Sequence, residues 1–326
     1  MIFPSADQII LDDIFVALPG FLKHATAYLK LESYNPGGSI KMKTAAALLD
    51  YAEQHAGLKQ SRRVIESSSG NLGVALSLIC AARGYRFTCV VDKNTLPANI
   101  KLIEAYGAEV VVISKLDANG GYLGSRLAYI QEKLAQERGL VWLNQYQSPA
   151  NPAVHSALTA QAVINQFPEL DFIFIGAGTT GTLAGCTERL RRDSPDTSII
   201  AVDSIGSVNF GGKPSRRFIP GLGSSVTPHF LREEGIDDFI SVAEADTVAM
   251  CHRMAREYGL LLGGSSGTVL SALAQYESVI APGSTVVVLS PDSGERYIDT
   301  LYNPEWVNER FPDFYAVREA IPVAMA

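Results

Sequence analysis

Asn35-Pro36-Gly37-Gly38-Ser39-Ile40-Lys41 is the stretch on which the interpretation of this chain rests. Residues 27–32 before it are predicted to form a short strand, and residues 44–51 after it, rich in alanine and leucine, predict a helix. Lys41 therefore leaves a glycine turn at the start of a helix. The positive end of the helix dipole favours a neutral amine or an imine there over an ammonium ion. Lys41 is accordingly either a Schiff-base lysine or a surface lysine in a first helical turn.

The composition indicates an acidic globular protein whose partners are small molecules. The 326 residues are 47% hydrophobic and carry a formal net charge of −7, which argues against a nucleic-acid surface. No apolar run approaches the roughly 20 residues of a membrane span, and the first residues lack a signal-peptide pattern, so we expect a cytoplasmic protein without a membrane partner. The four cysteines are scattered without a C-x-x-C pair, so we expect no metal site and no disulfide framework.

Predicted strands and helices alternate along the chain in two series. Strands separated by 10 to 15 residues of helical pattern imply right-handed βαβ units and a largely parallel sheet, with ligands at the carboxyl ends of the strands. The strands are predicted at 63–66, 86–92, 109–114, 140–144, 172–175, 199–203 and 285–290. The helices are predicted at 71–83, 97–106, 121–138, from the strand at 172–175 to 192, at 245–258 and at 268–278. The segment 147–152 between the series holds two prolines and is a plausible hinge.

Two loops with glycines and hydroxyls follow predicted strands. Residues 67–73, Ser-Ser-Ser-Gly-Asn-Leu-Gly, contain either an ordinary serine helix cap or a cradle for a carboxylate at a helix N-terminus. Residues 176–182 contain G-x-G-x-x-G, and Asp203 ends the next strand, so a dinucleotide site is one interpretation. The hydroxyls of its three threonines favour the other, a cup for a single phosphate.

A third loop, residues 262–268, contains G-x-S-x-G, the pattern of a hydrolase nucleophile elbow. That motif requires an acid and a histidine later in the chain. The last histidine is His252, so no histidine follows Ser265 and a hydrolase is excluded. Ser265 is better interpreted as a hydrogen-bonding neighbour of a ligand.

The order of these loops, followed by Pro291-Asp292-Ser293-Gly294-Glu295-Arg296-Tyr297, resembles the fold-type II pyridoxal-phosphate enzymes of the cysteine synthase and cystathionine β-synthase branch. The resemblance covers roughly residues 29–297. It implies that Lys41 holds pyridoxal 5'-phosphate as a Schiff base and moves the α-proton of the substrate. Ser265 would face the pyridine nitrogen and leave it unprotonated, which suits β-elimination and replacement through an aminoacrylate. The other implied cofactor contacts are Asn71 at the ring hydroxyl and Gly178, Thr179, Thr180, Gly181 and Thr182 at the phosphate. The implied contacts of the substrate α-carboxylate are Ser68, Ser69 and Gln145.

Within this branch, the stretches 35–39, 69–73, 117–126, 144–146 and 206–214 look closer to the synthases that join O-phospho-L-serine to L-glutamate. Their product, N-(2-amino-2-carboxyethyl)-L-glutamate, supplies 2,3-diaminopropionate for siderophores or antibiotics. By the same resemblance, Arg126 and Tyr146 could serve a phosphate leaving group or a second carboxylate. The alternatives are a solvated helix residue for Arg126 and core packing for Tyr146. Gly178 and residues 148–155 are instead similar to cysteine synthases, which use sulfide.

The sequence thus predicts a pyridoxal-phosphate dependent transferase with a two-lobed α/β fold of open, twisted, mostly parallel sheets flanked by helices. Residues 36–147 are expected to form the smaller, mobile lobe, and residues 1–35 with 148–326 the larger cofactor-binding lobe. The resemblance implies amino-acid substrates and a homodimer. A cysteine synthase, a dinucleotide-dependent oxidoreductase built on residues 176–181 and a catalytically silent amino-acid sensor are the alternatives.

Overall fold

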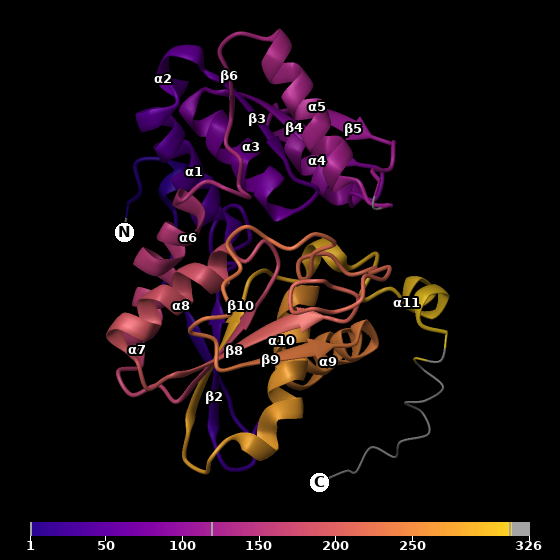
Figure 1. The fold of residues 1–326 in the computed structure, drawn as a ribbon. Coiled ribbons are helices and arrows are strands. Elements are labelled where there is room, and N and C mark those ends of the chain that lie inside the picture. The colour runs from indigo at the N-terminus through magenta and orange to yellow at the C-terminus, as the bar shows by residue number, and fades with distance from the viewer. Residues whose placement is uncertain (1, 119, 313, 315–326) are drawn as a thin grey trace.

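The computed structural model describes residues 2–118, 120–312 and 314. Its strands form two open sheets, one in each half of the molecule (Figure 1). The smaller half holds the third to the sixth strand along the chain. The larger half combines the first two strands with the last four. The predicted α/β fold with mostly parallel sheets flanked by helices is confirmed. Within the described residues, no helix is long and apolar enough to cross a membrane.

The sheet of the larger half has six strands in the order β1-β2-β10-β7-β8-β9. They are β1 (Phe15–Leu18), β2 (Thr26–Leu31), β10 (Thr285–Ser290), β7 (Phe172–Gly176), β8 (Ser198–Ser204) and β9 (Asp238–Val242). Only β1 and β2 pair antiparallel. The sheet of the smaller half has four parallel strands in the order β5-β4-β3-β6. They are β5 (Glu109–Ile113), β4 (Arg86–Asp92), β3 (Arg63–Ser67) and β6 (Leu140–Trp142).

Helices cover both sheets (Figure 1). Those of the smaller half are α1 (Lys41–His55), α2 (Leu58–Ser61), α3 (Asn71–Arg83), α4 (Pro97–Ala105) and α5 (Leu123–Gln136). Those of the larger half are α6 (Ala150–Val154), α7 (Gln161–Gln166), α8 (Gly181–Asp193), α9 (Glu244–Glu257), α10 (Gly264–Tyr276) and α11 (Pro304–Arg310). A π-helical turn, His155–Ala160, joins α6 to α7. Three short 3-10 helices lie at Ala6–Gln8, Glu277–Val279 and Glu295–Tyr297.

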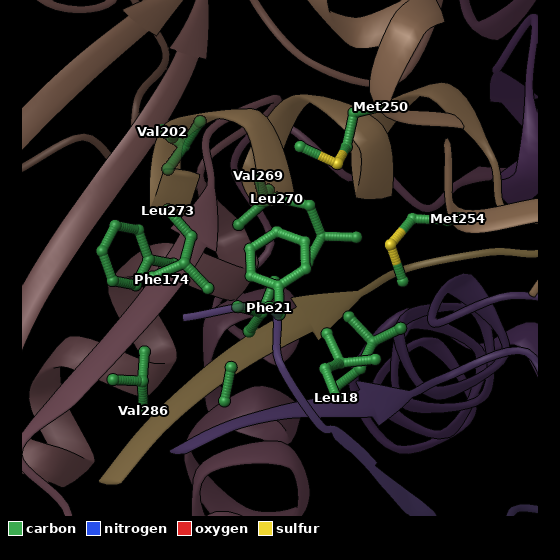
Figure 2. Packing of buried hydrophobic residues seen from close by; sticks show 14 of the residues in the cluster. Leu18, Phe21, Phe174, Val202, Met250, Met254, Val269, Leu270, Leu273 and Val286 are labelled. Carbon is green, nitrogen blue, oxygen red and sulfur yellow. The ribbon is translucent and has the colours of Figure 1, made fainter. Parts of the chain in front are cut away.

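The core of the larger half forms on both faces of its sheet, because successive strand residues point to opposite sides. On one face, Phe174 of β7 packs with Leu270 and Leu273 of α10 (Figure 2). On the other face, Ile173 and Ile175 pack with residues of α8. The apolar runs that predicted the central strands are therefore explained by burial on both faces, as expected for parallel sheets. The smaller half has a separate core around α1, α3 and β4.

Helical structure at residues 264–267 and 150–154 was not predicted. The helix expected to begin at residue 268 begins at Gly264. The small residues of its first turn let it approach α9, since a Cβ at Gly267 would lie 2.4 Å from Cys251 Sγ. The segment 147–152, predicted as a hinge, becomes helical at Ala150. Pro149 and Pro152 stand before and within the first turn of α6, where a missing N–H costs no helical hydrogen bond.

Candidate active site

Lys41 begins α1, as predicted. Burial lowers the pKa of its amine to about 8. No carboxylate of the described residues lies within ion-pair distance of it. The turn before it is fixed to the end of β10, because Ile40 N donates to Pro291 O at 2.8 Å and Ser39 forms a β-bridge with Asp292. The structure thus presents a partly neutral amine on a firmly anchored helix start.

Asp292 is a buried carboxylate on which three predicted or motif residues converge. Its Oδ2 accepts hydrogen bonds from Asn71 Nδ2 at 2.7 Å and from the Tyr297 hydroxyl at 2.6 Å, and its Oδ1 accepts from Ser265 Oγ at 3.3 Å. Burial raises the pKa of Asp292. Gly263 must lack a side chain, because a Cβ there would lie 2.0 Å from Asp292 Oδ1. Asp292 therefore holds the two residues predicted to face the cofactor ring.

The sequence analysis gave Asp292 no role, although a signal for it was present. It follows β10, a strand in the middle of a mostly parallel sheet, and polar residues at the carboxyl ends of such strands commonly face a ligand. Arg296, from the same motif, donates to Asn71 Oδ1 and to Gly37 O at 2.6 Å. These bonds tie Asn71 and the glycine turn of the smaller half to the larger half.

The predicted phosphate loop runs from Gly178 to Thr182 into α8. Thr180 adopts a left-handed conformation, with φ +63°, at the N-cap of the helix. Its Oγ1 is buried and has no hydrogen-bond partner among the described residues. Gly178 is constrained, because a Cβ would lie 2.6 Å from Gly221 O. A helix N-terminus beside an unpartnered buried hydroxyl is a suitable site for an anion.

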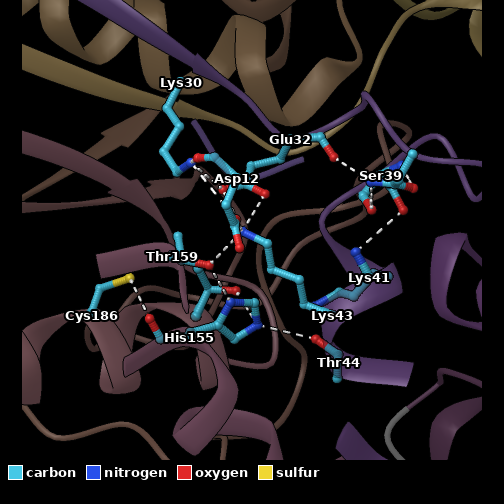
Figure 3. A network of polar contacts seen from close by, with 12 residues as sticks. Asp12, Lys30, Glu32, Ser39, Lys41, Lys43, Thr44, His155, Thr159 and Cys186 are labelled. Carbon is cyan, nitrogen blue, oxygen red and sulfur yellow. Dashed lines mark hydrogen bonds and ion pairs between the residues drawn. The ribbon is translucent and has the colours of Figure 1, made fainter. Parts of the chain in front are cut away.

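His155 joins the phosphate loop to the helix of Lys41. Figure 3 shows its contact with Thr44 of that helix. Its Nε2 lies 3.1 Å from Thr44 Oγ1 of α1 and 3.2 Å from Thr182 Oγ1 of α8. Its Nδ1 lies 3.1 Å from Thr159 Oγ1, which also accepts from Lys43 Nζ. Desolvation and two nearby lysines hold the pKa of His155 well below its ordinary value, so the ring is neutral. The sequence analysis missed this connection, whose members are distant in the chain.

A buried ionic cluster lies beyond this network. Lys30 and Lys43 are almost fully buried and pair with Glu32, whose Oε2 is 2.7 Å from Lys43 Nζ. Asp12 pairs with both lysines. Because the two cations and two anions balance, the cluster is neutral overall. It anchors β2 and α1 and supplies no net charge to the candidate site.

The loop between β3 and α3 brings the predicted substrate residues together. Ser68 Oγ accepts from Gly73 N at 2.9 Å, so this hydroxyl serves the start of α3. Ser69 Oγ donates to Asp92 Oδ2 at 2.7 Å and accepts from Arg126 Nη1 at 2.8 Å. Arg126 is thus not a solvated helix residue: its side chain is 11% exposed and reaches the loop.

Gln145 and Tyr146 lie on the other side of the same loop. Gln145 Nε2 donates to Ser67 O at 2.8 Å, and the Tyr146 hydroxyl lies 3.5 Å from the same oxygen. Beneath them, Glu66 accepts from Ser67 N at 2.7 Å and Gln145 N at 3.1 Å. Burial raises the pKa of Glu66 to about 7. Glu66, unnoticed in the sequence, therefore orients the loop from below.

The geometry combines a desolvated amine, an anion site at a helix end and a polar loop at another helix end, all at the carboxyl ends of strands. Among the described residues, no group of three histidines, cysteines or acids is arranged to hold a metal ion. The arrangement suits a small molecule with a phosphate and a second ligand with a carboxylate.

Comparison with known proteins supports the same kind of chemistry. The family model described as "Pyridoxal-phosphate dependent enzyme" matches residues 14–292. The chain is 38% identical over 286 residues to N-(2-amino-2-carboxyethyl)-L-glutamate synthase of Ralstonia nicotianae, covering 87% of this chain and 85% of that protein.

Solved structures of similar fold belong to enzymes of O-substituted serines. The crystal structure of O-ureido-L-serine synthase superposes with a TM-score of 0.86 at 32% identity, covering 93% of this chain and 96% of that one. That of the O-acetylserine dependent cystathionine β-synthase from Helicobacter pylori gives a TM-score of 0.84 at 25% identity, covering 92% and 98%.

Proposed function

Because the chain belongs to the pyridoxal-phosphate dependent enzymes, we propose that it exchanges the β-substituent of O-phospho-L-serine for the amine of L-glutamate. The product is N-(2-amino-2-carboxyethyl)-L-glutamate. The relative at 38% identity is named for this product, which supports the choice of nucleophile. The sequence-based prediction of the family, and with it of the cofactor, is confirmed; the family is not one of dinucleotide-dependent oxidoreductases.

The residues present fit pyridoxal phosphate. We propose that Lys41 binds it covalently, that the loop of Gly178, Thr179, Thr180, Gly181 and Thr182 holds its phosphate, and that Asn71 and Ser265 contact its ring. The unpartnered Thr180 hydroxyl at the start of α8 supports the phosphate site. When bound, pyridoxal phosphate withdraws electrons from the α-carbon of an amino acid, which allows the α-proton and then a β-substituent to leave.

Lys41 is the proposed acid and base of the reaction. An amine with a pKa of about 8 is neutral in a useful fraction of molecules near neutral pH and can accept the α-proton. No acid of the described residues is close enough to hold its proton as an ion pair. Asp292 orients Asn71 and Ser265 and so fixes the two side chains proposed at the ring.

The loop of Ser68 and Ser69, with Gln145, is proposed to bind the substrate α-carboxylate at the N-terminus of α3. Arg126 is proposed to make the enzyme prefer a phosphate leaving group. Its guanidinium contacts Ser69 Oγ, and its Nε pairs with Asp92 Oδ2 at 3.5 Å, so a cation held by one acid stands at the loop that would receive the amino acid. A phosphate leaving group gains a charge-assisted contact there that an acetate ester does not provide. Tyr146 is proposed to donate its hydroxyl to the same phosphate.

The nearest alternative is a cysteine synthase that uses sulfide. The enzyme with cofactor is incubated with O-phospho-L-serine and glutamate, or with O-acetylserine and sulfide, and the products are identified by mass spectrometry. We expect N-(2-amino-2-carboxyethyl)-L-glutamate from the first mixture and at least about tenfold slower turnover of the second. Productive use of sulfide alone would refute the proposal. An Arg126→Gln variant should raise the KM for O-phosphoserine more than that for O-acetylserine.

The wider setting is part of the same proposal. We propose a homodimer in the cytoplasm that supplies 2,3-diaminopropionate for a siderophore, with residues 36–147 closing on the rest of the chain when substrate binds. The bonds of Arg296 and Asp292 to Asn71 are contacts that such a closure would remake. Light scattering tests the dimer, and hydrogen exchange with and without O-phosphoserine tests the closure.

A further inference from the structure

A cavity of about 250 Å³ lies where the two halves meet, and none of the residues assigned to the active site lines it. The smaller half contributes Asn94 and Leu96, and the larger half contributes the loop at residues 216–220 and helix α11. Its volume is below the ~300–1,000 Å³ of pockets for drug-sized ligands, so it suits a small metabolite.

The charge of this cavity is opposite to that of the chain. Its lining contains Arg216, Arg217 and Arg310 and no aspartate or glutamate, whereas the formal net charge of the protein is −7. Cations gathered around a concave site raise the local concentration of anions. The cavity therefore selects for an anionic ligand.

Two of the guanidinium groups are held by packing against aromatic rings. The guanidinium carbon of Arg216 lies 4.9 Å from the ring centre of Phe218, and that of Arg310 lies 5.9 Å from the same centre and 4.5 Å from that of Trp306. Phe218 is itself fixed, because its backbone N–H donates to Glu244 at 2.9 Å. The two cations are thus positioned without being neutralised by a buried acid.

The three arginines differ in what else they bind. Arg217 donates to the backbone carbonyls of Ser224 and Gly206, so it fixes the loop. Arg216 is exposed and has no hydrogen bond or ion pair with the described residues. Arg310 pairs with Glu309, whose side chain is 73% exposed and competes weakly with a bound ligand. Arg216 and Arg310 are the two groups available to bind anionic groups.

The cavity lies beside the candidate active site, because Leu301 lines the cavity and also packs against the start of α10. Ile219 and Leu301 pack beside Gly264, the residue before Ser265, at 2.4 and 3.2 Å from where its Cβ would be. The same loop continues to Gly221, whose carbonyl faces Gly178 of the phosphate loop. A ligand in the cavity is therefore next to the loops that form the site.

We propose that this cavity, the arginine pocket, binds a small dicarboxylate through Arg216 and Arg310, with its methylene groups against Phe218 and Trp306. Two cations from separate elements match two separate carboxylates, and the aromatic wall matches the apolar chain between them. Identifying this dicarboxylate as the co-substrate glutamate rests on the proposed function. The pocket then receives the nucleophile, and Arg126 serves the activated serine.

Calorimetric titration of the enzyme with bound cofactor tests the pocket. Glutarate is the probe, because it carries both carboxylates of glutamate but no amine and cannot react. The variants are Arg216→Gln, which alters an exposed side chain, and Arg216→Gln with Arg310→Gln. Arg192→Gln, which removes an exposed arginine of α8, is the matched control. We expect glutarate affinity to fall about tenfold in the double variant, severalfold in the single variant and not in the control.

Two further measurements separate this proposal from the proposed function. In turnover, the double variant should raise the KM for glutamate about tenfold and leave that for O-phosphoserine within twofold. Unchanged glutarate affinity in the double variant, or equal competition by inorganic phosphate, overturns the arginine pocket while leaving glutamate turnover intact. Glutarate binding that depends on Arg216 in an enzyme that does not consume glutamate supports the pocket and overturns the proposed function.

Discussion

Lys41 and Lys43 stand two positions apart in the first turn of α1, yet their amines lie in opposite electrostatic surroundings. Burial lowers the pKa of Lys41 to about 8, and no carboxylate opposes that shift. Desolvation would also lower the pKa of Lys43, but Glu32 and Asp12 raise it above its ordinary value. Both lysines belong to the same helix and both side chains are buried. Neither the helix nor burial alone therefore explains why the pKa of Lys41 is lowered and that of Lys43 is raised.

The difference is the placement of acids. Lys43 meets Glu32 and Asp12 and remains a fixed cation within a neutral cluster. Lys41 has no carboxylate of the described residues within ion-pair distance; the buried carboxylate of Asp292 is hydrogen-bonded to Asn71, Tyr297 and Ser265. The pKa of Lys41 stays lowered because no nearby acid offsets its burial.

Removing the reactive amine should have the largest effect. We expect Lys41→Ala to lower kcat by at least about a thousandfold and to abolish the absorption of covalently bound cofactor, because Lys43 cannot replace it. Absorption spectra and product assays check both results. The thermal midpoint should change little, since Lys41 makes no ion pair with the described residues. Residual covalent cofactor in this variant would mean that another amine reacts.

Breaking the ionic cluster should instead affect folding. Lys43→Met leaves the buried Glu32 and the partly exposed Asp12 facing Lys30 alone, and we expect a loss of about 3 kcal/mol in the free energy of unfolding. Urea denaturation measures it. Adding Glu32→Gln restores the charge balance and should recover at least about half of the loss. Equal instability of single and double variants would show that packing, not charge, is the cause.

The pH dependence of cofactor uptake should report Lys41 directly. The neutral amine is the nucleophile, so the uptake rate of the apoprotein should rise about tenfold from pH 7 to 9 and level off above the pKa of about 8. Because the folded pKa is below the ordinary 10.5, Lys41 binds fewer protons folded than unfolded between pH 8 and 10.5, and its contribution to stability rises with pH there. Stopped-flow absorbance measures the rate. A rate still rising at pH 10 would assign uptake to an unperturbed lysine.

Replacing Asp292 should have a smaller effect, on the affinity for the cofactor. In Asp292→Asn, one of the two acceptor oxygens becomes an NH₂ group that faces a donor. Either Asn71 or Ser265 then loses its hydrogen-bond acceptor. We expect the dissociation constant of the cofactor to rise about fivefold, measured by fluorescence after removing and restoring it. Tyr297→Phe, which removes a donor to Asp292 but leaves Asn71 and Ser265 in place, should cause less than a twofold change.

Local patterns predicted much of this molecule. The helix of residues 71–83 and the strand of residues 86–92 were predicted to the residue, because their caps, glycines and apolar periods all lie within the segments themselves. The short helix at residues 150–154 was not predicted, because the effect of the two prolines depends on whether they fall at the start of a helix. Asp292 was passed over because its partners Asn71 and Ser265 are distant in sequence. The ionic cluster was missed for the same reason, as it joins Asp12, Glu32 and Lys43.

The pairing of β2 with β10 has a consequence for synthesis on the ribosome. Residues 26–31 can pair with residues 285–290 only after the latter have been synthesised, so the middle of the larger sheet forms late. The four strands of the smaller half are all synthesised between residues 63 and 142. The smaller half can therefore collapse early, and the nascent chain carries Lys41 for most of translation without the residues that later shelter it. The proposed binding of vitamin B6 to Lys41 therefore has to follow the synthesis of residues 285–290.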